Sequence, residues 1–311
     1  MPPIRPGDKI LWKKGKRRVA AKQPSPRQCV EWLAASNLHG VLIRGATWLA
    51  CTRQLAYFLE RVCLGRKTPA RAAAGVPVFS NALGNGDPPA PDEVPVVVRL
   101  SAEETFYLAH TLGCLTVHSV ERGTPPGEEP PEAATGTGEE PWLMRLSLDE
   151  LWTALLATNA GGAGGAHFIA RCAAHVVQRR EGWLPRSGLQ YGADLVLYRN
   201  HPSLVHSDHC VVLRPGAELR AAAATATGTA AAICDDDDDE PAGLRRWTEV
   251  QAVSRLCVQV NKGLVTATAE CPPGTDASKP DCVRATTLRE TAIARFNPER
   301  FVRDGGGGER P

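Results

Sequence analysis

Three compositionally biased segments divide this chain, because none of them has the side chains needed for a hydrophobic core. Residues 121–141 are rich in Pro, Gly and Glu, residues 221–243 run from an alanine-rich stretch into an acidic one, and residues 304–311 are rich in Gly. Such compositions favour linkers, loops and disordered tails over packed elements. The chain has 311 residues, which is enough for about two ordinary domains. The folded units must therefore lie between these segments.

The first folded unit is expected over residues 27–120, as a small N-terminal α/β domain. Its clearest element is a helix from Ser101 to Leu112. Ser101 is a suitable N-cap, and Glu103 and Glu104 fall in the first turn, where carboxylates interact well with the helix dipole.

A helical segment is expected over residues 142–182, after the Pro/Gly/Glu-rich linker. Ser147 and Glu150 have the spacing of a capping box, and a second helix-like stretch runs from Ala166 to Arg180.

The pattern changes to strands in the last third of the chain. Residues 188–199, 209–214 and 256–271 alternate in polarity or are rich in β-branched residues, and residues 247–255 have helical spacing. This order predicts a compact C-terminal domain over residues 183–303, with a mixed sheet flanked by helices. The whole chain is therefore expected to be of the α/β (α+β) class, with 221–243 as a low-complexity acidic loop inside the second domain.

The charge balance limits how the chain can bind a polyanion. It has 36 Lys and Arg against 34 Asp and Glu, a net charge of +2, so net charge alone cannot drive nucleic-acid binding. Local basic patches must supply any RNA contact. Residues 1–26 hold such a patch, which suits a nuclear-localisation signal, an RNA contact or simply a disordered basic tail.

The ten cysteines contain no C-x-x-C pair and no tight cluster. This pattern indicates reduced, buried thiols and neither a zinc ribbon nor a disulfide framework. The start of the chain has no apolar leader pattern, and no run of about 18 apolar residues occurs, so we expect a soluble intracellular protein without a membrane segment.

The densest group of chemically useful side chains lies between two predicted strands. Tyr198, His201, His206, His209 and Cys210 fall within one short stretch. A metal site is one interpretation, but zinc sites on loops generally have a second ligand pair, and no such pair follows. The clustered carboxylates that a hard cation prefers occur only in the acidic low-complexity run.

Acid–base cleavage of RNA is the other interpretation. The 2′-hydroxyl of RNA is a built-in nucleophile, so cleavage needs a base, an acid and a cation on the phosphorane. Tyr, His and Lys can supply these functions. Since Tyr and Lys have reference pKa values of about 10 and His about 6.5, a Tyr can act as base only where a neighbouring cation lowers its pKa. Composition alone does not select the residues from four Tyr, eight His and the lysines.

The stretch GLQYGADLVLYRNHPSLVHSDHCVVL, residues 188–213, resembles the catalytic stretch of the tRNA-splicing endonuclease family. In that family a strand of the form G-x-x-[YF]-G-x-[DH]-[FL]-x-x-Y ends at the catalytic Tyr, and a His-[SA] pair follows eight residues later. Tyr198 matches the Tyr, and His206 with Ser207 matches the pair.

A second stretch, VSRLCVQVNKGLV, is similar to the family pattern S-R-[VL]-x-x-x-V-x-K-x-L. Arg255 matches its Arg and Lys262 its catalytic Lys. The two motifs occur in the family's order, and the resemblance covers roughly residues 183–303.

The resemblance implies a metal-independent endoribonuclease without a cofactor. Tyr198 would be the general base, His206 the general acid and Lys262 the stabiliser of the transition state, leaving 2′,3′-cyclic phosphate and 5′-hydroxyl ends. Arg255 and an aromatic residue would sandwich a substrate base. Phe296 stands where the family usually has Trp; the other interpretation of Phe296 is packing against the last element.

The YR dipeptide at Tyr198 and the ending ARFNPER resemble plant-type members of the catalytic subunit that cuts the 5′ splice site. This implies intron-containing pre-tRNA as substrate, a second catalytic subunit and two structural subunits as partners in a heterotetramer, and a nuclear location, with cytoplasm or an organelle left open. A non-catalytic structural subunit is the first alternative, although it would be expected to lose Tyr, His or Lys. A metal-dependent nuclease using Asp194 and Asp208 is the second.

Overall fold

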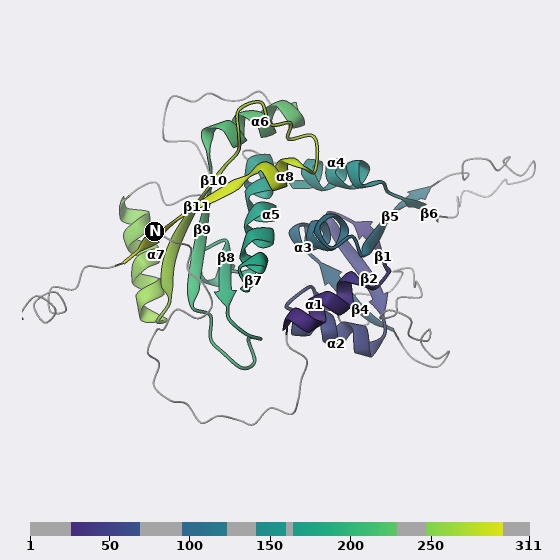
Figure 1. Ribbon diagram of the computed structural model, residues 1–311, viewed down its shortest axis with the longest axis horizontal. Helices are drawn as coiled ribbons and strands as arrows, with labels where there is room; N and C mark the ends of the chain where they lie inside the picture. The colour runs from purple at the N-terminus through teal and green to yellow at the C-terminus, as the bar shows by residue number, and fades with distance from the viewer. Residues whose placement is uncertain (1–25, 69–94, 123–140, 160–163, 229–246, 295–311) are drawn as a thin grey trace, which may run out of the picture.

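The computed structural model describes residues 26–68, 95–122, 141–159, 164–228 and 247–294. These residues form a six-stranded and a five-stranded sheet, each containing both parallel and antiparallel pairs. Helix α5 (Gly164–Arg180) lies between the two sheets (Figure 1). The predicted class, a mixed N-terminal unit followed by a C-terminal domain with a helix-flanked mixed sheet, is confirmed.

The N-terminal unit is built on the six-stranded sheet. Its strands, in spatial order, are β3 (Arg66–Lys67), β4 (Val96–Leu100), β2 (Ala46–Cys51), β1 (Leu38–Ile43), β5 (Leu115–Arg122) and β6 (Pro141–Arg145). Strand β6 lies after the Pro/Gly/Glu-rich segment and pairs antiparallel with β5. The N-terminal sheet therefore extends beyond residue 120, into residues that the sequence pattern assigned to a helical segment.

Helices α1 (Pro26–Ala34), α2 (Arg53–Arg61) and α3 (Ala102–Phe106) contribute apolar side chains to the core on one face of this sheet. The capping box of α3 is present: the Ser101 hydroxyl accepts from the Glu104 N–H, and the Glu104 carboxylate accepts from the Ser101 N–H at 2.8 Å. The helix continues as a π-helical turn, η2 (Tyr107–Thr111). The same two-way capping occurs between Ser147 and Glu150 at the start of α4 (Leu148–Asn159).

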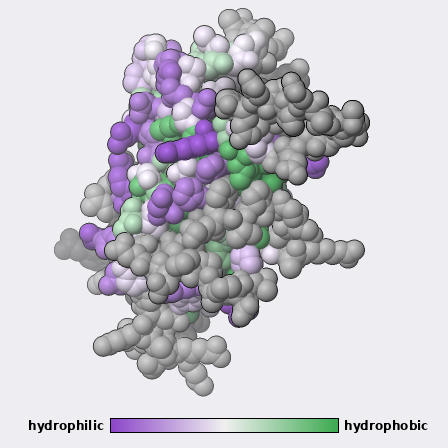
Figure 2. Space-filling model, turned by 90° about the vertical axis from the view of Figure 1, so that its right-hand side faces the viewer, coloured by the Kyte–Doolittle hydropathy of each residue, from purple (hydrophilic) through white to green (hydrophobic). Residues whose placement is uncertain are grey.

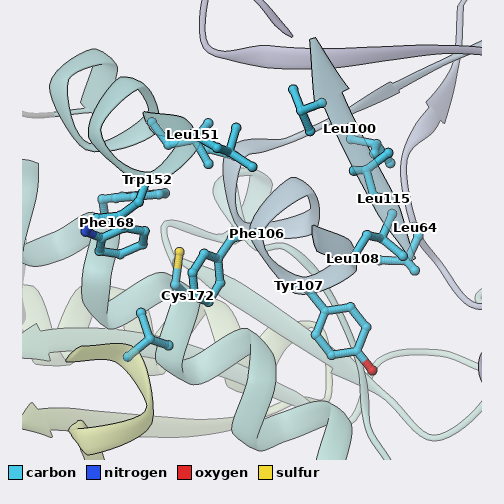
Figure 3. Close-up of a cluster of buried hydrophobic side chains, with 14 of the residues drawn as sticks. Leu64, Leu100, Phe106, Tyr107, Leu108, Leu115, Leu151, Trp152, Phe168 and Cys172 are labelled. Atoms are coloured by element: carbon cyan, nitrogen blue, oxygen red, sulfur yellow. The ribbon is translucent and has the colours of Figure 1, made fainter. Parts of the chain in front are cut away.

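One hydrophobic core joins the N-terminal unit to α5. Phe106 of α3, Trp152 of α4 and Phe168 of α5 are all buried, with ring centroids 5.1 and 5.5 Å apart along the series (Figure 3). Arg179 of α5 adds polar ties, since its guanidinium donates to the carbonyls of Val62 and Cys63, just after α2, at 2.9 and 3.0 Å. The two sheets are thus parts of one packed body.

The five-stranded sheet carries the C-terminal domain. Its strands, in spatial order, are β11 (Thr287–Ile293), β10 (Gly263–Glu270), β9 (His209–Pro215), β8 (Leu195–Tyr198) and β7 (Leu184–Ser187). Strands β9 and β10 are parallel, and the other neighbours are antiparallel. Helix α5 covers one face and α7 (Trp247–Gln259) the other (Figure 1). Helices α6 (Ala217–Thr227) and α8 (Cys282–Ala285) lie near the N-terminal end of α5.

Three local predictions differ from the structure. Residues 189–191 form a short 3-10 turn, η3 (Leu189–Tyr191), where a strand was predicted, because the left-handed Gly192 (φ 64°) turns the chain before β8. Helix α7 continues to Gln259, since the buried Cys257 extends the stripe of partly buried Val250 and Val253 by one helical turn. Residues 221–227 belong to α6, as the high helix propensity of alanine favours.

Several sequence-based predictions fall outside the described residues: those for the basic stretch 1–25, the acidic run, Phe296 and the Gly-rich tail. Nine cysteines are described, and all are free and buried as predicted. Among the described helices, none has the length and apolar character to cross a membrane. The face in Figure 2 shows hydrophilic side chains gathered on one side and hydrophobic ones toward the middle.

Candidate active site

Strand register brings Tyr198 and Lys262 to the same end of the C-terminal sheet. Tyr198 is the last residue of β8, and Lys262 immediately precedes β10. Leu197 of β8 and Gly263 of β10 both pair with His209, the first residue of β9. Since neighbouring strands lie about 4.8 Å apart, the backbones at Tyr198 and Lys262 flank the entry to β9 at a separation of roughly two strand spacings.

Backbone hydrogen bonds fix the loop that carries His206 at this entry. The Asp208 N–H donates to the Leu197 carbonyl at 2.9 Å, and the Gly263 N–H donates to the Asp208 carbonyl at 2.8 Å. His206 lies two residues before Asp208 and is exposed, whereas the neighbouring Ser207 is buried. The three predicted catalytic residues therefore lie on three adjacent segments at one sheet edge.

The end of α7 determines where Lys262 lies. Asn261 adopts a left-handed conformation (φ 56°), which Asn tolerates better than most residues, and the Lys262 N–H donates back to the Cys257 carbonyl at 2.8 Å. This turn ends the helix and directs the chain into β10. The Lys262 ammonium donates to the Ser207 carbonyl at 3.1 Å. It is thereby held beside the predicted His206–Ser207 pair.

Two tyrosines line the same region. Tyr191 and Tyr198 both pack at the edge of the small core beneath α7, and the Lys262 ammonium lies 5.2 Å from the Tyr191 ring centroid, within cation–π range. Burial raises the pKa of the Tyr191 phenol, and the neighbouring Tyr198 raises it further. Tyr198 itself is half-buried and packs against this cluster.

Arg199 braces the loop at its first residue. Its guanidinium forms an ion pair with the Asp208 carboxylate and lies 5.9 Å from the Trp183 ring centroid. The two ends of the loop are therefore joined through side chains as well as backbone. Sequence reasoning did not single out this brace or the contact between Lys262 and Tyr191, because neither follows from a residue spacing.

The other two histidines of the stretch do not join the site. His209 begins β9, as predicted, and is buried against Trp183 at 5.5 Å between ring centroids; burial lowers its pKa, and nearby Asp208 partly opposes this. The His201 ring contacts α2 through a hydrogen bond to the Glu60 backbone, and its Nδ1 lies 2.7 Å from the Ser203 hydroxyl.

The carboxylates of the metal-nuclease alternative have other partners. Asp194 accepts from the Leu213 N–H at 2.7 Å and lies 2.9 Å from His167 Nε2, and Asp208 is paired with Arg199. In the part of the chain that the structure describes, no three His, Cys, Asp or Glu side chains are grouped as metal ligands would be.

Of the two predicted substrate-binding residues, only Arg255 lies within the described part of the chain. Arg255 lies on α7, two helical turns before Lys262, and is exposed. Its guanidinium is therefore open to a ligand. Phe296 lies outside the described residues, so the predicted Arg–Phe sandwich stays a prediction.

Comparison with known proteins gives an independent result for the C-terminal domain. Residues 168–272 match the family described as the tRNA intron endonuclease, catalytic C-terminal domain. The match begins inside α5 and ends just after β10, and thus includes Tyr198, His206 and Lys262.

Individual relatives point the same way. A rice (Oryza sativa subsp. japonica) protein, "Probable tRNA-splicing endonuclease subunit Sen2", is 30% identical over 64% of this chain and 53% of its own length. The "tRNA-splicing endonuclease subunit Sen2-2" of Arabidopsis thaliana is 26% identical over 93% of this chain and 89% of its own length. A mouse (Mus musculus) "tRNA-splicing endonuclease subunit Sen2" is 28% identical over 65% of this chain and 35% of its own. The chain thus spans about half of the rice protein and about a third of the mouse protein.

Proposed function

We propose that this chain is a member of the tRNA-splicing endonuclease family and an endoribonuclease subunit that cleaves intron-containing pre-tRNA. The match of residues 168–272 to the catalytic domain of that family and the similarity to Sen2 subunits support the proposal. The observation that supports the proposal is the location of the segments that carry Tyr198, His206 and Lys262, which the register of β8, β9 and β10 brings to one end of the C-terminal sheet. These three side chains provide the base, acid and cation that cleavage by the 2′-hydroxyl requires.

In the proposed reaction Tyr198 removes the proton of the 2′-hydroxyl, and the resulting oxyanion attacks the adjacent phosphorus. His206 protonates the departing 5′-oxygen, which leaves a 2′,3′-cyclic phosphate and a 5′-hydroxyl. Lys262 stabilises the negative charge of the phosphorane. Its ammonium donates to the neutral carbonyl of Ser207 in the free protein, and an anionic phosphate is the stronger acceptor.

Substrate contacts are proposed for the α7 side of the site. Arg255 is exposed on α7 and would hold a base of the bulged RNA by stacking, with Phe296 on the other side of that base. Phe would replace the Trp common in the family, and its π-face attracts a cation less strongly.

The choice of junction and the assembly are also part of the proposal. The resemblance of the YR dipeptide at Tyr198 and of the ending ARFNPER to the subunit that cuts the 5′ splice site supports cleavage at that junction. Similarity to proteins named as subunits supports action within a complex, and we propose a second catalytic subunit and two structural subunits as its other members. Nuclear function is proposed from the family and from the basic stretch in residues 1–26.

The test is cleavage of an intron-containing pre-tRNA by the chain co-expressed with its partner subunits, in EDTA, comparing wild type with His206→Ala. His206 is exposed, so its removal should leave folding intact. We expect the wild type to cut the 5′ junction in EDTA and the variant to be slower by about 10² to 10⁴.

A Leu204→Ala variant is the matched control, since Leu204 is an exposed residue of the same loop. Cleavage that is lost in EDTA would establish the metal-dependent alternative. An unchanged rate in His206→Ala would remove the general acid from the mechanism, and cleavage of the 3′ junction alone would contradict the proposed specificity.

A further inference from the structure

A cavity of about 260 Å³ lies where the N-terminal unit meets the loop after β8. One wall comes from α2, β3 and β4, and the other from Arg186 of β7 and from His201 and Pro202 of the loop. His201 follows Tyr198 by three residues, a length of chain that spans at most roughly 11 Å. The cavity is therefore a close neighbour of the proposed active site, but it shares none of its three catalytic residues.

The lining of this cavity is positively charged. Arg66, Lys67 and Arg186 contribute three cations, against the single carboxylate of Glu60. Glu60 is ion-paired with Lys67, and both side chains are half exposed. Arg66 is exposed and has no ion-pair partner among the residues that the structure describes. An excess of two positive charges in a concave site favours an anionic ligand.

The loop is docked onto α2 through His201. Its ring is hydrogen-bonded to the backbone carbonyl of Glu60, and Nδ1 lies 2.7 Å from the Ser203 hydroxyl. Burial and the nearby guanidinium of Arg61 lower the pKa of His201, while Glu60 opposes them. Arg61 is itself buried, and its Nε has no hydrogen-bond partner. A further guanidinium thus reinforces the positive field on this side of the loop.

We propose that this cavity binds a backbone phosphate of the RNA substrate, one that flanks the phosphate being cleaved. The inference rests on the proposed function, because it assigns a second contact to the same substrate. Arg66 and Arg186 have the planar donor geometry that suits phosphate oxygens. A phosphate contact of this kind positions the strand without reading its sequence. Since His201 and His206 lie on one loop, RNA held in the cavity is aligned with the general acid.

The test measures pre-tRNA cleavage and binding by the complex with its partner subunits, comparing wild type with Arg66→Gln. Arg66 is exposed on a short strand, so the substitution should not affect folding. Loss of one charge-assisted contact should raise KM about tenfold. The value of kcat should equal that of the wild type, because the contact is the same in the ground state and the transition state. The slope of log affinity against log salt should become shallower by about 0.7, the value for one phosphate of a single strand.

Arg214→Gln is the matched control, since Arg214 is exposed at the opposite end of β9. It should leave KM, kcat and the salt slope unchanged. The double variant Arg66→Gln/Arg186→Gln should raise KM further than either single change.

Several outcomes would overturn the inference while leaving the proposed function intact. One is wild-type cleavage of pre-tRNA together with an Arg66→Gln variant whose KM and salt slope are those of the wild type. Another is a variant that loses affinity for a free nucleoside monophosphate but not for pre-tRNA, which would identify a small-nucleotide site instead. Failure of the wild-type complex to cleave or bind pre-tRNA would instead refute the proposed function.

Discussion

The two faces of the five-stranded sheet are covered very differently. On the α5 face, the inward side chains of β8 and β9 pack against Trp183 and α5, and the opposite side of α5 enters the large core of the N-terminal unit. On the α7 face, a small cluster centred on Val196, Cys210 and Cys257 is covered by one helix. Val258 and Val260, at the end of that helix, are exposed.

The proposed chemistry lies on the thinly covered side. Tyr198 shares the α7 face with Val196, and Lys262 follows directly from the end of α7. Residues that must meet a large polyanion need access, whereas the register of the strands that carry them needs a rigid support. The two requirements are met on opposite faces of the sheet: packing on the α5 face supports the strands, and the α7 face leaves the proposed catalytic residues accessible to RNA.

The largest expected effect is on stability and comes from the α5 side. Phe168→Ala would leave a cavity between Trp152 and the rest of the core, and we expect the free energy of unfolding to fall by about 3–5 kcal/mol. Urea denaturation measures it. Val253→Ala, on the α7 side, should cost only about 1 kcal/mol. Equal losses in the two variants would mean that the two faces support the fold equally.

A smaller effect is expected at the start of β10, where the strand follows Lys262. A Cβ on Gly263 would come within 2.5 Å of the buried His209 ring, so Gly263→Ala should lower the free energy of unfolding by about 1–3 kcal/mol. It should also reduce kcat, because Lys262 is the preceding residue. The double variant Gly263→Ala/His209→Ser makes room for the methyl group and should recover activity; no recovery would show that the clash is not the cause.

The last expected effect is a pH dependence of stability that originates on the α5 side. The Arg179 Nε–H donates to His175 Nε2 at 2.7 Å, so the buried His175 ring is neutral. Burial, followed by Arg179, holds its pKa well below the usual 6.5, and burial also lowers the pKa of His209. Protonation therefore favours the unfolded chain. The contribution of these two neutral histidines to the free energy of unfolding should be fully present above about pH 6.5. It should fall on acidification by up to roughly 1.4 kcal/mol per pH unit for each histidine.

Urea midpoints measured at pH 7.5 and 5.5 test this expectation. His209→Leu should show a weaker loss at the lower pH than the wild type. An equal loss in His209→Leu and the wild type would contradict the contribution of His209.

The elements that could be predicted from sequence are those with local causes. The helix at Ser101 and the helix at Ser147 have capping pairs, and β9 has a β-branched run bounded by the loop. Where prediction was wrong, tertiary context decided the outcome. Residues 256–259 have strand-forming side chains but continue α7, because Cys257 can reach the small core only on a helical period.

The same distinction holds for the candidate site. Tyr198, His206 and Lys262 were predicted from two motifs, and strand register brings the segments that carry them together. The cavity beside the loop was not predicted, because Arg66 and Arg186 are 120 residues apart and meet only when the N-terminal unit packs against the loop. No spacing rule links residues that belong to separate sheets.

The start of the family match does not coincide with the start of a unit that could fold alone, because the match begins within α5. The family match begins at residue 168, four residues into a helix that starts at Gly164. A fragment cut at that boundary would lack the helix's first turn and would expose the surface of α5 that packs against α3 and α4. A transplant of the C-terminal domain into another protein must therefore include the N-terminal unit, or else redesign the outer surface of α5 for contact with water.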